Sequence, residues 1–157
     1  MKTVRLAVFE TNSSSEHSVT ITDAETFHSW TLDEALFLEE EQSFKTLKEV
    51  FDEMKADKDA DDSIKAVTFS EFDLFVTYSE SVRRYAHLDC PEDTLYDGFK
   101  QYEHLTPETL KNLWWWMHNN GYVTFDEYKS DEELEFWSEK SDVKGFLVVA
   151  FGKYGFC

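Results

Sequence analysis

The sequence predicts an α+β fold, in which a small antiparallel sheet made of an N-terminal hairpin and a C-terminal strand packs with several inserted helices. Three observations predict this class. Apolar residues alternate with others along Thr3–Thr22, which is the two-residue period of paired strands. The segment Gly145–Phe151 is apolar on both faces, as a central buried strand is. Capping signatures and helical apolar spacing recur between these two ends.

Length and composition predict one acidic α+β domain that spans residues 1–157. The chain is 41% hydrophobic and 17% aromatic, which is enough apolar surface for one substantial core. No apolar run approaches the roughly 20 residues of a membrane span. Glu10 also comes too early for the apolar segment of a signal peptide. We therefore expect a cytoplasmic protein that does not bind a membrane.

The N-terminal hairpin is predicted from strands at Thr3–Phe9 and His17–Thr22 and from the polar loop Glu10–Ser15 between them. Small hydroxyl and amide side chains in this loop can hydrogen-bond nearby backbone and tolerate turn conformations. A short helix is expected at Asp23–Trp30. Pairing of the hairpin with the C-terminal strand would bring Gly152–Gly155 near the loop.

Local patterns predict the helices that follow. Thr31 and Glu34 form a capping box that opens a helix to about Gln42. Phe44–Lys55 is expected to be the next helix, because its apolar side chains recur at helical spacing and form one stripe.

The sequence pattern in the middle of the chain fits more than one kind of element. Ala66–Tyr78 suits either a helix or a strand, and we favour a helix from Glu71–His87 that Ser70 caps. Pro91 fits the first position of a helix at Glu92–Tyr102, because proline lacks the amide hydrogen that a first helical turn leaves unpaired.

Three further elements are predicted before the C-terminal strand. Thr106–Pro107 marks the start of a helix that ends near Asn119, and Gly121 is a plausible left-handed stop. A capping box at Thr124–Glu127 opens a short helix. Asp131–Lys140 is expected to form another, strongly acidic helix.

The net charge of −18 comes from 33 acidic residues against 15 Lys and Arg. Such a surface repels phosphate backbones, which argues against direct binding to nucleic acid or anionic membrane and favours a basic protein partner. The alternative is that the charged runs are only solvated helix faces. The candidate partner contacts lie in three acidic clusters: Glu39, Glu40 and Glu41; Asp57, Asp59, Asp61 and Asp62; and Glu132, Glu135 and Glu139.

Three consecutive tryptophans, Trp114–Trp116, cannot all face one core, because successive helical residues turn by about 100°. Leu110, Trp114 and Met117 fall on one apolar stripe, which leaves Trp115 on nearly the opposite side. Exposed tryptophan is a common anchor in binding surfaces, so Trp115 is a further candidate partner contact. The alternative is that another helix covers it.

The hairpin loop is a candidate anion- or ligand-binding site. Consecutive backbone amides can bind an anion, and a serine beside a histidine offers a nucleophile and a base. No Gly-x-Ser-x-Gly elbow surrounds the serines, and His17 shares strand parity with apolar residues, which favours a structural role. We therefore expect a mainly architectural loop and assign no catalytic residues. The candidate ligand contacts are Asn12, Ser13, Ser14, Ser15 and His17.

The sequence predicts no metal site and no cofactor. His87, Asp89 and Cys90 are potential ligands, but no partner set at suitable spacing accompanies them. The two cysteines, Cys90 and Cys157, permit no disulfide scaffold, and we expect both to be reduced thiols. Thr106–Tyr128 loosely resembles a helix-turn-helix, but its acidic residues would repel a phosphate backbone.

The first residues of the chain resemble the start of a known family. Arg5 and the string from Val8, Val-Phe-Glu-Thr-Asn-Ser-Ser-Ser-x-His-Ser, resemble the start of a family of short uncharacterised proteins from Gram-positive bacteria and their phages. Trp30, Gly121–Tyr128 and Val149–Gly155 also look like that family. The resemblance implies a phage or mobile-element setting, and hence the cytoplasm of a host cell, but no catalytic residues.

Three classes of function fit these observations. The first is a phage-encoded inhibitor, in which carboxylates imitate nucleic-acid phosphates and block the basic channel of a host defence nuclease such as a CRISPR effector. The second is a regulatory interaction module without mimicry. The third is a small enzyme or anion-binding domain centred on the serine-rich loop. The charge and the resemblance favour an interaction protein over an enzyme.

Overall fold

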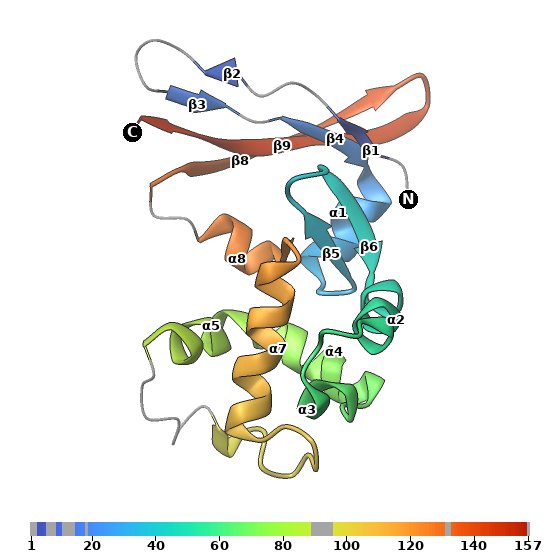
Figure 1. Ribbon diagram of the computed structural model, residues 1–157. Coiled ribbons are helices and arrows are strands. Elements are labelled where there is room, and N and C mark those ends of the chain that lie inside the picture. Colours follow the sequence, from blue (N-terminus) through green and yellow to red (C-terminus); the bar gives the residue numbers. More distant parts are fainter. Residues whose placement is uncertain are drawn as a thin grey trace.

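The computed structural model describes the backbone of residues 3–5, 9–10, 15–17, 19–88, 96–130 and 133–156. It is an α+β structure with two antiparallel sheets, which confirms the predicted fold class. In Figure 1 the larger sheet forms one end of the molecule and most of the helices form the other. The smaller sheet lies between them.

The larger sheet has the strand order β1-β4-β9-β3-β2, with β8 also paired to β9. Its strands are β1 (Thr3–Arg5), β2 (Phe9–Glu10), β3 (Ser15–His17), β4 (Thr20–Asp23), β8 (Glu135–Val143) and β9 (Phe146–Phe156). The C-terminal strand β9 has partners on both sides, as predicted, but it is not buried throughout, because Phe146 and Leu147 are 74% and 54% exposed. The N-terminal segments pair with each other through β1 with β4 and β2 with β3. Loop positions 11–14 lie outside the described residues.

The smaller sheet contradicts the predicted helix from Thr31 to Gln42. Its order is β6-β5-β7, with β5 (Ala35–Leu38), β6 (Ser43–Thr46) and β7 (Tyr122–Val123). Thr31 is the last residue of the preceding helix rather than the cap of a new one. Asp33 then turns the chain with a φ of 60°, and all four residues of β5 are buried. Burial on both faces outweighed the local capping pattern here.

The helices are α1 (Ala24–Thr31), α2 (Leu47–Ala56), α3 (Asp62–Lys65), α4 (Phe69–Thr77), α5 (Ser79–Leu88), α7 (Pro107–Asn119) and α8 (Phe125–Lys129). Side chains cap them as local rules require: Asp23 caps α1, Thr106 caps α7 and Thr124 caps α8. These three starts, the proline at the start of α7 and the positive φ of Gly121 were predicted.

Other helix predictions need correction. The helix expected at Phe44–Lys55 begins only at Leu47, because Ser43–Thr46 pairs in the smaller sheet and Thr46 forms the capping box. The single helix expected at Glu71–His87 is two helices that meet at Tyr78, and Thr68 caps the first of them instead of Ser70.

The expected helix at Glu92–Tyr102 lies partly outside the described residues. Within them, Tyr96 and Asp97 are helical, and residues 98–104 form turns and a bend.

The acidic helix expected at Asp131–Lys140 is wrong, because Glu135–Val143 is the strand β8. It pairs with β9 along its whole length, from Glu135 opposite Tyr154 to Val143 opposite Phe146. Lys144 and Gly145 both have positive φ, at 53° and 86°, so they form the tight two-residue turn that joins antiparallel strands.

Two hydrophobic clusters form the core, and β5 separates them. Leu36 and Leu38 belong to the larger cluster, which also contains buried side chains of α2, α4 and α7. Phe37 belongs to an aromatic cluster beneath the larger sheet. Trp30 is fully buried there, with its ring centroid 5.1 Å from that of Phe151. Within the described part of the chain, no helix has the length and apolarity needed to cross a membrane.

Candidate functional site

The first acidic cluster, Glu39–Glu41, forms the turn between β5 and β6. All three side chains are exposed, and none of them has a cationic partner among the described residues. The turn is held by Gln42, which is buried with a φ of 50° and donates from its side-chain amide to the carbonyl of Val19, 3.2 Å away. A fixed backbone therefore presents three unneutralised carboxylates.

The second acidic cluster lies between α2 and α3 and is partly architectural. Asp57 accepts a hydrogen bond of 2.8 Å from the indole of Trp116, and this bond lowers the pKa of the Asp57 carboxyl. Asp61 caps α3 by accepting from the amide of Ser63, and the side chain of Ser63, followed by this amide, lowers the pKa of the Asp61 carboxyl. The side chains of Asp59 and Asp62 are exposed.

The third acidic cluster lies on a strand instead of the predicted helix. Glu135 and Glu139 are both exposed on β8, and Glu135 accepts a hydrogen bond of 2.8 Å from the hydroxyl of Tyr154. That bond raises the pKa of Tyr154 above its ordinary value. Glu132 lies outside the described residues.

Trp115 lies away from the core, which confirms the predicted helix phase. It is 37% exposed, whereas Trp114 and Trp116 are buried. Its ring stands edge-on to that of Trp114, with centroids 4.9 Å apart. Trp115 is thus an exposed aromatic side chain on α7, and its use as a partner contact stays a prediction.

A cleft of about 710 Å³ brings together residues that the sequence did not connect. Its walls come from the β5–β6 turn, α5, α7, β7, α8 and the segments leading into β8 and along β9. Its lining residues are Glu39, Glu40, Arg83, Trp114, His118, Gly121, Tyr122, Val123, Glu127, Ser130, Glu133 and Lys153. Two members of the first acidic cluster therefore face a hollow that contains two further glutamates and two cationic side chains, those of Arg83 and Lys153.

Glu127 is the most perturbed acid of this cleft. Burial raises the pKa of its carboxyl, and hydrogen bonds only partly offset that effect. The donors are the hydroxyls of Ser79 and Thr124, at 2.9 and 3.1 Å, and the indole of Trp114, at 3.3 Å. All three are neutral groups from α5, the cap of α8, and α7. Glu127 therefore ties three helical elements together beside the cleft.

The sequence predicted one of these contacts of Glu127. The capping box at Thr124 had marked Glu127 as a helix-capping residue, and the amide of Glu127 does donate to the Thr124 hydroxyl at 3.2 Å. Its proximity to Trp114 and to Ser79 depends on the packing of distant segments and left no local pattern. The stacking of His118 on Trp114, with centroids 4.8 Å apart, follows from their spacing of one helical turn.

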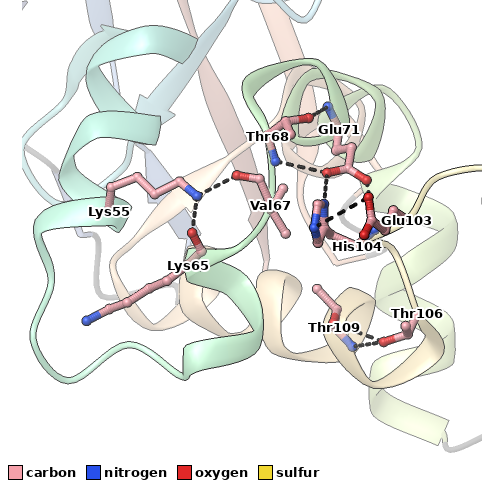
Figure 2. Close-up of polar contacts among 9 residues, drawn as sticks. All are labelled: Lys55, Lys65, Val67, Thr68, Glu71, Glu103, His104, Thr106 and Thr109. Carbon is pink, nitrogen blue, oxygen red and sulfur yellow. Dashed lines mark hydrogen bonds and ion pairs between the residues drawn. The ribbon is translucent and has the colours of Figure 1, made fainter.

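A second buried carboxylate is part of the architecture of the helical half (Figure 2). Glu71 caps α4 together with Thr68, whose amide donates to it over 2.9 Å. The backbone amide and the ring of His104 lie 2.9 Å from the two Glu71 oxygens. Burial opposes ionisation of Glu71, but these hydrogen bonds outweigh it and lower the pKa. Lys55 donates nearby to the carbonyls of Lys65 and Val67 (Figure 2).

The serine-rich loop is described only at its two ends, Glu10 in β2 and Ser15 in β3. Backbone pairing places Ser15 opposite Phe156 and His17 opposite Tyr154, so the chain from the loop does run beside the C-terminal strand. Asn12, Ser13 and Ser14 lie outside the described residues. In the part of the chain that the structure describes, no group of three or more potential ligands is placed to hold a metal ion.

Fold and surfaces together define the class: an acidic α+β protein whose carboxylates gather at exposed turns, on an edge strand and around one cleft. Comparisons of the chain with protein-family models, curated proteins and solved structures gave no match. Its class therefore rests on the structure itself.

Proposed function

We propose that this protein is an interaction protein that binds a basic, nucleic-acid-handling partner through its carboxylates. In the fuller form of the proposal, it is a phage-encoded inhibitor that imitates nucleic acid and occupies the basic channel of a host defence nuclease, such as a CRISPR effector. The phage setting derives from the resemblance of the opening motif. The interaction itself is supported by the charged surfaces.

One observation carries the proposal: the β5–β6 turn presents Glu39–Glu41 exposed and without cationic partners, next to a cleft that contains Glu133. Clustered charge of one sign steers an oppositely charged partner and suppresses the binding of anionic ones. A rigid backbone adds to this effect, because fixed charges need no reordering on binding. A nucleic-acid channel lined by Lys and Arg is complementary to such a surface.

The test measures inhibition of purified nuclease effectors of Gram-positive bacteria by the full chain. The expected result is that the chain displaces nucleic acid from one effector, with an affinity that falls as salt rises because the charges are screened. Replacing Glu39, Glu40 and Glu41 together by Lys should abolish the inhibition.

The matched control replaces Glu25, Asp73 and Glu103 by Lys, which changes the net charge equally at exposed, scattered positions. It should retain most of the inhibition. If both triple variants inhibit like the original chain, or lose inhibition equally, the carboxylates at the β5–β6 turn are not the binding surface.

A regulatory interaction module without mimicry is the second candidate, and the exposure of Trp115 favours it. In that case binding would depend on an aromatic anchor, so Trp115→Ala would weaken it by on the order of 2 kcal/mol. Added salt would then have little effect, and nucleic acid would not compete.

A further inference from the structure

The two faces of the larger sheet differ in what covers them. Residues paired directly across antiparallel strands share a face, and successive residues alternate between faces. Val149 and Phe151 on β9 are buried in the aromatic cluster, beneath which lie α1 and α8. The alternate positions of β9, which include Phe146 and Tyr154, belong to the opposite face. At the end of the β8–β9 hairpin both faces are open, because Leu147, which shares the face of Val149, is 54% exposed.

The outer face carries exposed apolar side chains, together with the polar or charged residues Asp23, Glu135, Glu139 and Ser141. Phe146 is 74% exposed and pairs with Val143, which is 51% exposed, at the end of the β8–β9 hairpin. Further along, Trp137 is half-buried and pairs with Gly152, which has no side chain to cover it. The other apolar members are Ile21, Val148, Ala150 and Tyr154, from β4 and β9.

The charged groups of this face have one sign. Cross-strand pairing places Glu135 and Glu139 on it, both exposed and alternating with Trp137 along β8. No Lys or Arg occupies a described position of β4, β8 or β9 on this face. The result is an apolar strip bordered by carboxylates.

The charge of the outer face determines which kind of partner can bind the apolar strip. A second copy of the chain would bring two molecules of net charge −18 together and place Glu135 and Glu139 against like charges. A partner whose apolar surface is bordered by Lys and Arg would complement both the apolar strip and the carboxylates beside it. Exposed apolar side chains grouped on one face of a protein generally mark an interaction site.

We infer that the outer face of the larger sheet is the docking surface for the basic partner, with Phe146, Val143 and Trp137 as its apolar contacts. The inference rests on the proposed function and adds a second contact region to it. The carboxylates at the β5–β6 turn would steer the partner, and the apolar strip would hold it, because buried aromatic anchors dominate binding energy in interfaces.

The first experiment replaces Phe146 by the photo-crosslinking residue p-benzoylphenylalanine in the full chain, produced in Gram-positive bacterial cells. Tyr78, which is similarly accessible at 51% but lies in the helical half, carries the same residue in the control. The expected adduct forms from position 146 with a basic protein, weakens with added salt, and does not form from position 78. An adduct with a second copy, an acidic protein or no protein overturns the inference.

The second experiment measures the affinity of the crosslinked partner after purification. Phe146→Ala should weaken binding by about tenfold or more, whereas Phe146→Leu should retain most of it because the apolar contact remains. Tyr78→Ala should have no effect. Melting curves of all variants check that folding is intact, which the exposure of Phe146 leads us to expect.

The experiments can disprove the docking surface and the proposed function independently of each other. If the partner binds Phe146→Ala as tightly as the original chain but loses the Glu39, Glu40 and Glu41 to Lys variant, the docking surface is wrong and the proposed function stands. If neither change affects binding, both are wrong. If only Phe146→Ala weakens binding and salt has no effect, the strip binds a partner but the charge argument fails.

Discussion

At the scale of single residues, the three adjacent tryptophans divide their roles between stability and surface. Trp114 and Trp116 donate from their indoles to Glu127 and Asp57, and both are buried. Trp115 is instead partly exposed, and its ring contacts the ring of Trp114 edge-on. Their positions follow from the turn of about 100° per helical residue, so this assignment needed no tertiary information.

We predict that Trp115→Ala costs about 1 kcal/mol or less in the free energy of unfolding, because the change removes edge-on ring contacts, with Trp114 and His118, at a solvent-exposed site. Trp114→Ala should cost about 3 to 5 kcal/mol, because it opens a cavity in the larger cluster. Chemical denaturation of both variants measures the difference. Equal losses would mean that Trp115 belongs to the core.

Asp33 should make the protein less stable as the pH rises. Burial raises its pKa from 3.8 to about 6, and the charges of Asp126, Asp73 and Glu127 add to this effect. Below pH 3.8 the carboxyl is protonated in both the folded and the unfolded state. Between these values the unfolded state ionises first, so stability falls until about pH 6 and stays lower above it.

Asp33→Asn should therefore raise the free energy of unfolding at pH 7 by about 1 to 2 kcal/mol, a value reduced for solvent screening at this half-buried site. Asparagine tolerates the φ of 60° as aspartate does, so no backbone strain is added. The gain should vanish near pH 4. Glu34→Gln, at an exposed neighbouring position, is the control, and a gain independent of pH would contradict the prediction.

At the scale of elements, the sequence predicted those whose signals are local. The starts of α7 and α8 were found because one capping side chain and one amide suffice to define each. The strand β9 was found because its apolar residues occupy both faces.

The missed elements depend on distant partners. Ala35–Leu38 is a strand because it separates two cores and pairs with β7, far along the chain. Glu135–Val143 is acidic enough to suit a solvated helix, and pairing with β9 decides otherwise. The cleft is likewise built by tertiary packing, so its residues Glu127, Trp114 and Lys153 left no common pattern in the sequence.

Glu71 joins the N-terminus of α4 to His104. Its contribution to stability should change with pH in the opposite direction to that of Asp33. The pKa of Glu71 lies below 4.5 in the folded state, so its contribution to stability is present above that pH and is lost as the pH falls through the folded value. Glu71→Gln should cost about 2 to 3 kcal/mol at pH 7, because buried donors lose a charged acceptor.

Denaturation curves between neutral and acidic pH test this prediction. The loss caused by Glu71→Gln should shrink as the pH falls. Glu103→Gln is the matched control, because Glu103 is highly exposed and lies 4.0 Å from the His104 ring. A loss from Glu71→Gln that stays the same at acidic pH would show that volume or shape, rather than charge, explains the effect.

At the scale of the whole molecule, charge repulsion opposes folding. Compaction brings the acidic residues of a chain with net charge −18 closer together, and salt screens their repulsion. We predict that the melting temperature rises as sodium chloride is added at neutral pH. The Lys variant of Glu39, Glu40 and Glu41 should melt higher than the original chain at low salt and gain less from added salt. A melting temperature that falls with salt would mean that ion pairs outweigh repulsion.

The position of β9 has a consequence for the order in which the molecule is made. The strands β3 and β4 are synthesised before the helical half and pair with β9, which is synthesised after it. The helical half, by contrast, makes many of its contacts between neighbouring segments and can form while translation continues. The larger sheet, and with it any surface on its outer face, is therefore completed only once β9 has been synthesised, so a chain that stops before β9 cannot present it.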